Sequence, residues 1–164
     1  MENIIFQDNR LILKVGKTSW LIKIILFPTA FLFFLLPTSG LVLSLSEGNG
    51  LTFGIVIVLA IFFLLSFYLL RISLWNTLGK EIIDIGKEKI TYTADYGWFK
   101  DSVKEIPIQN LECTIRLNQS NTEGVLIFES DEERVESVIE LPILVLEDVL
   151  SQFKNSVPLS NTSD

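Results

Sequence analysis

The 164-residue chain has no histidine, one cysteine, five prolines and nine glycines. Without histidine, no imidazole can act as a general base, nucleophile or metal ligand, which removes the commonest enzyme chemistries. One cysteine cannot form an internal disulfide, and so little glycine and proline excludes collagen-like chains. Charged residues are also scarce, at 20%, whereas hydrophobic residues make up 49%. A soluble domain of this size needs more polar surface, so the composition favours a small domain with a membrane anchor.

Two long segments contain no aspartate, glutamate, lysine or arginine. They are residues 24–45 and 51–70. Each is long enough to span, because a helix of about 20 apolar residues crosses a hydrocarbon core of about 30 Å. The turn between them, residues 46–50, allows only an antiparallel connection. We therefore predict a retained transmembrane helical hairpin within residues 20–75.

Lysine and arginine flank the outer ends of both segments, whereas the connecting turn has only Glu47. By the positive-inside rule, both termini are expected in the cytoplasm of a multi-pass protein of a bacterial inner membrane or an equivalent membrane. Two helices bury little surface against each other, so self-association or a partner helix is compatible with this anchor. The residues predicted to anchor the hairpin at the membrane interface are Trp20, Lys17, Lys23, Arg71 and Trp75.

After the second apolar segment the chain changes to short alternating segments bounded by turn residues, which is typical of β-strands. The predicted strands are 81–85, 89–94, 103–108, 111–117, 125–129 and 134–141. In the second of these, Ile90, Tyr92 and Ala94 share one face. The period becomes helical over residues 144–153. We predict an α+β membrane protein whose domain, residues 76–155, is closed by a C-terminal helix and followed by a flexible tail, residues 156–164.

The segment before the hairpin, residues 1–19, is expected in the cytoplasm. Its apolar stretches 4–6 and 11–15 flank a polar turn. They predict either a small hairpin added to the cytoplasmic sheet or a segment lying in the membrane interface, and the sequence leaves both open.

One junction carries a family resemblance. After the two spans, the chain has LWNTLGKEII over residues 74–83, then a strand, a glycine turn, a second strand and the turn Tyr96–Phe99. This layout resembles bacterial two-span membrane proteins with a pleckstrin-homology-like (PH-like) domain, a mostly uncharacterised family. This resemblance implies a six- to seven-stranded β roll or barrel capped by a C-terminal helix. The layout is also similar, more distantly, to the photosystem I assembly factor of chloroplasts and cyanobacteria.

Two turns are candidate partner contacts. The first has three aromatic residues, which either form a binding surface, pack under the sheet or dip into the membrane interface. The second is the densest acidic cluster, which fits a basic partner or a cation but is more often a solvated turn; it lacks EF-hand spacing. The candidate contact residues are Tyr96, Trp98, Phe99, Asp131, Glu132 and Glu133.

The remaining chemistry argues against an enzyme. Cys113 alternates with apolar residues in a predicted strand and is expected to be a small buried side chain. The acidic residues are expected on turns and outward faces rather than converging. Residues 71–164 contain nine Lys and Arg against 17 Asp and Glu, a net charge of −8, which disfavours nucleic acid. We expect no cofactor and no metal.

The function expected from this sequence is a non-enzymatic adaptor or accessory subunit of a membrane protein complex. It would present a PH-like protein-binding module at the lipid bilayer, with an integral membrane protein or complex as its partner. Two alternatives remain open: an assembly factor for a photosynthetic or respiratory membrane complex, and a lipid-sensing module. The lipid-sensing alternative depends on the loop Lys87–Lys89, in which two lysines flank a glutamate.

Overall fold

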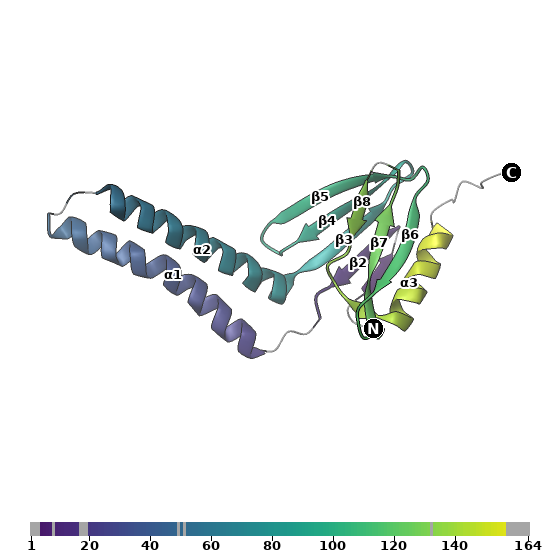
Figure 1. Ribbon diagram of the computed structural model, residues 1–164, viewed down its shortest axis with the longest axis horizontal. Helices are drawn as coiled ribbons and strands as arrows, with labels where there is room; N and C mark the ends of the chain where they lie inside the picture. The colour runs from purple at the N-terminus through teal and green to yellow at the C-terminus, as the bar shows by residue number, and fades with distance from the viewer. Residues whose placement is uncertain are drawn as a thin grey trace. The chain divides into compact units, whose positions relative to one another are not determined.

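The computed structural model describes residues 4–7, 9–16, 20–48, 50, 52–131 and 133–156. The chain forms two compact units. A helical unit comprises residues 17–77, and a β unit combines Met1–Gly16 with Leu78–Asp164. The β unit is therefore assembled from segments on both sides of the helical unit in the sequence (Figure 1).

The helical unit consists of α1 (Trp20–Ser46) and α2 (Phe53–Leu78). Both helices are long and apolar enough to cross a membrane, and only 6% of the most apolar stretch of each is buried inside the protein. The predicted segments lie largely in these helices. However, α2 continues eight residues beyond the predicted end at residue 70, because residues 71–78 contain neither proline nor glycine and Gly79 follows them.

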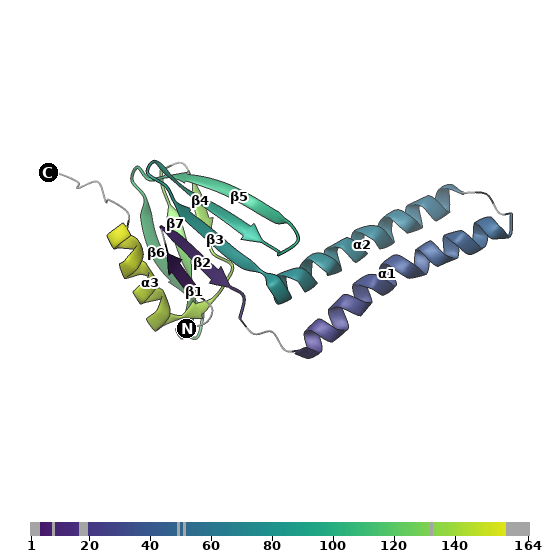
Figure 2. The same ribbon diagram turned by 180° about the vertical axis from the view of Figure 1, so that it is seen from behind.

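Five antiparallel strands form the first sheet of the β unit, in the order β1-β2-β3-β4-β5. They are β1 (Ile4–Gln7), β2 (Arg10–Lys14), β3 (Lys80–Ile85), β4 (Lys89–Asp95) and β5 (Lys100–Pro107). Of the two interpretations of the N-terminal segment, the hairpin added to the sheet is the one found. Leu11 pairs with Ile83 and Leu13 with Glu81, and both leucines are fully buried. Figure 2 shows this hairpin, β1 and β2, from behind.

The second sheet has four strands, with β6-β7-β8 in order and β9 also paired to β7. They are β6 (Glu112–Leu117), β7 (Glu123–Glu129), β8 (Arg134–Glu136) and β9 (Leu141–Pro142), and α3 (Ile143–Ser156) follows. The predicted helix 144–153 lies within α3.

The predicted strand 134–141 is wrong as a single element, because residues 137–140 leave the ladder between β8 and β9. Ser137 replaces the regular pairing there: its backbone N–H donates to the carbonyl of Leu126 at 2.8 Å, and its Oγ accepts from the Leu126 N–H at 2.9 Å. This division and the N-terminal hairpin raise the strand count among the described residues to nine, above the six to seven expected.

The core of the β unit is formed by one face of each sheet and by α3. Ile90, Tyr92 and Ala94 are buried together on one face of β4, as the alternation predicts. In the second sheet, the ring of Phe128 meets that of Phe153 from α3 edge to face, with centroids 5.2 Å apart. The amphipathic helix α3 thus covers the second sheet (Figure 1).

Candidate functional site

The aromatic turn, which we define as Tyr96–Phe99, connects β4 to β5. The Tyr96 N–H donates to the carbonyl of Phe99 at 2.9 Å, and the Gly97 N–H donates to Oδ1 of Asp95 at 2.8 Å. The rings of Tyr96 and Phe99 stack, with centroids 4.7 Å apart and an interplanar angle of 13°. Tyr96 is buried and Phe99 half-buried, whereas Trp98 is 69% exposed. Of the three predicted contact residues in this turn, only Trp98 presents a largely free ring.

The aromatic turn also packs closely on the start of the β unit. Gly97 has φ of +88°, and a Cβ placed on it would lie 2.9 Å from Cβ of Leu78, the last residue of α2. Any residue other than glycine at position 97 would therefore have a strained backbone and would clash with Leu78. Lys80 and Asp95, which pair across β3 and β4, form an ion pair of 3.4 Å beside the same turn.

The predicted acidic contact lies in the turn between β7 and β8. Asp131 accepts a hydrogen bond from Nδ2 of Asn110 at 2.7 Å, and Glu133 is exposed; Glu132 lies outside the described residues. Nearby, Arg134 pairs with Glu129 at 3.8 Å. No group of three or more histidine, cysteine or acidic side chains that could hold a metal occurs within the described part of the chain. The two described members of this cluster, Asp131 and Glu133, are both exposed.

The described residues among the predicted interface anchors lie near the start of α1 and near the end of α2. Trp20 begins α1 and is 66% exposed, and Lys23, Arg71 and Trp75 are half-buried. Lys17 lies outside the described residues. Arg10, a cation that precedes the first apolar segment in the sequence, forms an ion pair with Asp84 across β2 and β3. Its charge is thus partly offset on the sheet.

A buried carboxylate, Glu81, is the main polar feature that the sequence analysis missed. It is fully buried on β3. Its Oε1 accepts from Oη of Tyr92 and from the N–H of Val138, both at 2.6 Å, and its Oε2 accepts from the N–H of Ile139 at 3.4 Å. The expectation that all acids lie on turns and outward faces is wrong for this residue. Strand alternation gives the signal, because Glu81 shares a face with the buried Ile83 and Ile85.

The surroundings of Glu81 alter its acidity and that of its partner. Burial raises the pKa of Glu81, and the hydrogen bonds from Tyr92, Val138 and Ile139 oppose that rise. Burial, together with the adjacent carboxylate, also raises the pKa of Tyr92. All three donors point at one side chain that is sealed from solvent. Glu81 therefore links β3 of the first sheet to the segment between β8 and β9, and its geometry suits a structural role rather than proton transfer to a substrate.

Cys113, on β6, is half-buried. Burial raises the pKa of its thiol to about 12, although the charge of Lys154 opposes the rise. The expected burial of this side chain is therefore only partial. A thiol with a raised pKa is a weak nucleophile at neutral pH.

The two helices of the hairpin contact each other through small and aromatic residues. Ser66 of α2 donates to the carbonyl of Ala30 of α1 at 2.8 Å. Two aromatic pairs follow on the same side, Phe33 with Phe62 at 5.6 Å between centroids and Phe34 with Phe63 at 5.2 Å. Small residues and interhelical hydrogen bonds of this kind are what hold helices together in lipid.

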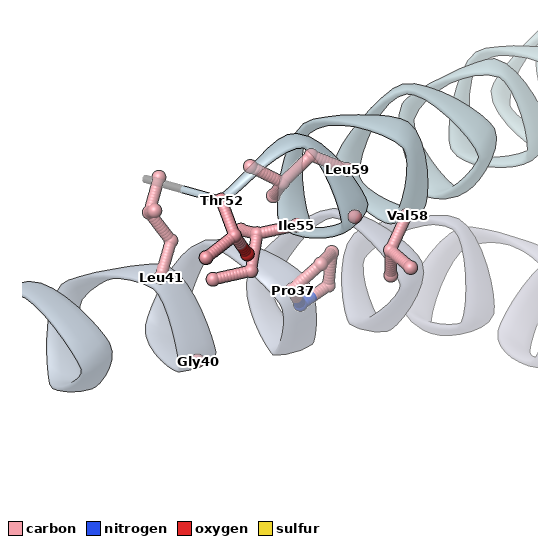
Figure 3. A pocket seen from close by; sticks show the side chains of 8 residues that line it. Pro37, Gly40, Leu41, Thr52, Ile55, Val58 and Leu59 are labelled. Atoms are coloured by element: carbon pink, nitrogen blue, oxygen red, sulfur yellow. The ribbon is translucent and has the colours of Figure 1, made fainter. Parts of the chain in front are cut away.

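A cavity of about 460 Å³ lies between the helices near their connection. The side chains that line it are apolar apart from the hydroxyl of Thr52, and they come from both helices, with Pro37 on α1 and Ile55 on α2 (Figure 3). The residues that line it are Pro37, Gly40, Leu41, Thr52, Gly54, Ile55, Val58 and Leu59. Without charge or convergent polar groups, this cavity offers packing space rather than a site for chemistry.

Comparison with protein-family models, with curated proteins and with solved structures finds no match to this chain.

Proposed function

We propose that this chain is a non-enzymatic integral membrane protein that presents a PH-like protein-binding module to a membrane protein or complex, as an adaptor or accessory subunit. The observation that carries the proposal is the direct joining of two apolar, largely uncovered helices to a folded β unit. α2 ends at Leu78 and β3 begins at Lys80, so only Gly79 separates them.

The apolar surface of the hairpin supports the membrane anchor. Phe31 is 60% exposed, Leu35 55% and Leu64 71%. Full burial of such a side chain contributes about 1.5–3 kcal/mol relative to full exposure, and more than half of each of these side chains is uncovered. Many of them lie on α1 and α2, and the rest of the chain covers very few, so the bilayer is the environment that suits them.

The architecture of the β unit supports the PH-like assignment. Two antiparallel sheets, with a C-terminal helix packed on the second, are what such a roll requires. The N-terminal hairpin, β1 and β2, is an addition to that plan. Because a fold of this kind carries many binding roles, the assignment bears on how the module is built and not on its ligand.

The surface chemistry supports a protein partner over a lipid headgroup. Lys89, in the loop on which lipid sensing depends, forms an ion pair of 2.6 Å with Glu105. This pairing reduces the attraction of that loop for an anionic headgroup. The exposed Glu133 and the overall negative charge of the β unit instead favour a partner with a basic surface.

The test is purification of the tagged full-length protein from its native membranes in mild detergent, with quantitative mass spectrometry of the proteins retained. A partner at fixed ratio is the expected result. Recovery only with immature complexes would favour an assembly factor, and recovery of the protein alone would exclude stable complex membership.

Two variants examine the acidic contact. Glu133→Lys should reduce the retained partner, whereas Glu147→Lys, which makes the same charge change at an exposed position on α3, should leave it in place. Equal retention by both variants would remove the acidic turn from the interface.

A further inference from the structure

We infer that Trp98 is a second membrane contact of this protein: the aromatic turn places its indole ring in the lipid headgroup layer beside the end of α2. This inference rests on the membrane anchor in the proposed function. It assigns Trp98 to the bilayer rather than to a protein partner.

The aromatic turn is built to hold the Trp98 ring outward. Its backbone is closed by the hydrogen bond between Tyr96 and Phe99 and by that from Gly97 to Asp95. The two neighbouring rings stack on each other and not on Trp98, which stays 69% exposed. An indole with this exposed fraction leaves a large apolar surface uncovered.

The position of the turn follows from its contact with Leu78. α2 has 26 residues, which corresponds to about 39 Å, whereas the hydrocarbon core is about 30 Å and the whole bilayer about 40–45 Å. A centred helix therefore ends about 5 Å beyond the hydrocarbon. If the core ends at Leu70 instead, Leu78 lies about 12 Å beyond it. The headgroup layer is about 5–7 Å thick on each side, so Leu78 lies within it in the first case and about 5 Å outside it in the second. Gly97 packs directly on Leu78, so the turn lies at this level of the chain.

The chemistry of the turn suits that layer. Tryptophan is enriched at membrane interfaces because its ring is apolar and its N–H needs a polar partner. Lys100, two residues after Trp98, is exposed and can approach lipid phosphates. The nearest acid before the ring, Asp95, is already paired with Lys80 and with the Gly97 N–H.

The opposite end of the same strand pair provides the contrast. The turn between β3 and β4, residues 86–88, has exposed Lys87 and Glu88 and no aromatic residue. Six residues of strand separate the two ends, a distance of about 20 Å. A contact through Trp98 would therefore fix the β unit at one end, in addition to its covalent link through Gly79.

The test is fluorescence quenching of single-tryptophan full-length chains in phosphatidylcholine vesicles. The first chain keeps Trp98 and has Trp20→Phe and Trp75→Phe. In two further chains Trp98 is also replaced by Phe, and the reporter is Lys87→Trp or Leu64→Trp. The quenchers are brominated lipids and acrylamide in the water phase. The bromine lies close to the headgroup for positions 98 and 87, and deep in the acyl chain for position 64, which is near the middle of α2.

We expect brominated lipid to quench Trp98, and acrylamide to quench it about threefold less than the reporter at position 87. If lipid quenches the reporter at position 64 but acrylamide quenches Trp98 as strongly as the reporter at position 87, the inference is wrong and the membrane anchor stands. Failure of lipid to quench position 64 would instead overturn the anchor and the proposed function.

A second measurement avoids multiple substitutions. The wild-type chain labelled with fluorotryptophan gives three resonances, of which Trp98→Phe identifies one. A paramagnetic lipid headgroup label should broaden that resonance. The inference is wrong if the Trp98 ring is shielded from water in native membranes but its resonance is not broadened by the lipid label in vesicles that contain no other protein. In that case Trp98 contacts a protein.

Discussion

Replacement of Glu81 should destabilise the β unit more than replacement of any surface acid. Its carboxylate accepts from Tyr92, Val138 and Ile139 and is fully buried. Glu81→Ala leaves these donors without an acceptor, and an unsatisfied buried donor costs about 1–3 kcal/mol. Some donors regain a partner if water enters the space, so we expect a total loss of about 3–5 kcal/mol in the free energy of unfolding.

A variant of Tyr92 separates the loss of a hydrogen bond from the loss of side-chain volume that Glu81→Ala also causes. Tyr92→Phe removes one donor and keeps the ring, so it should lower the free energy of unfolding by about 1.5–3 kcal/mol. The double variant should be less destabilised than the two single variants added together, because Glu81 and Tyr92 share an interaction.

The pH dependence follows from the raised pKa of Glu81, which lies above its ordinary value of 4.5 because burial disfavours the charged form. Between the unfolded and the folded pKa, the folded state holds more protons than the unfolded state. The contribution of Glu81 to stability is therefore fully present below pH 4.5 and falls as pH rises through the folded pKa. Glu81→Gln does not titrate, so its stability relative to wild type should rise over this window.

The assay is urea unfolding of the full-length chain in nonionic detergent, followed by pulse proteolysis at pH 4.5 to 8. Glu105→Gln is the matched control, because that acid is 54% exposed on β5 and its ion pair with Lys89 should contribute less than about 1 kcal/mol. The reasoning is refuted if Glu81→Ala costs no more than this control, or if wild type and Glu81→Gln have the same pH slope.

Three further predictions concern the N-terminal hairpin, the aromatic turn and the cysteine. Leu11→Ala should lower the free energy of unfolding by about 2–5 kcal/mol in the same assay, because that side chain is fully buried on β2; a loss below 1 kcal/mol would place β2 outside the core. Gly97→Ala should lower it by about 1–3 kcal/mol, through positive φ and the clash with Leu78, and an unchanged midpoint would contradict that close packing. Cys113 should react with iodoacetamide at pH 8 far more slowly in the folded chain than in urea, since its pKa is raised to about 12; equal rates would show an accessible thiolate.

The sequence by itself determined the elements whose signals are local. A span requires one continuous apolar segment, so both helices of the hairpin could be predicted within a few residues at most ends. Alternation over residues 89–94 likewise predicted which side chains of β4 are buried, and helical spacing predicted α3. Membrane sidedness and the binding role stay predictions, because they depend on surroundings outside the chain.

The tertiary structure decided the features that join distant segments. Arg10 and Asp84 are 74 residues apart in sequence, so no local pattern could place β2 beside β3. Glu81 and Val138 are 57 residues apart, and their hydrogen bond joins β3 to residues 137–140, which leave the predicted strand. A local pattern defines each strand, but it does not show which distant strand lies beside it. A buried polar group such as Glu81 needs a partner, and only the folded chain shows which distant segment provides it.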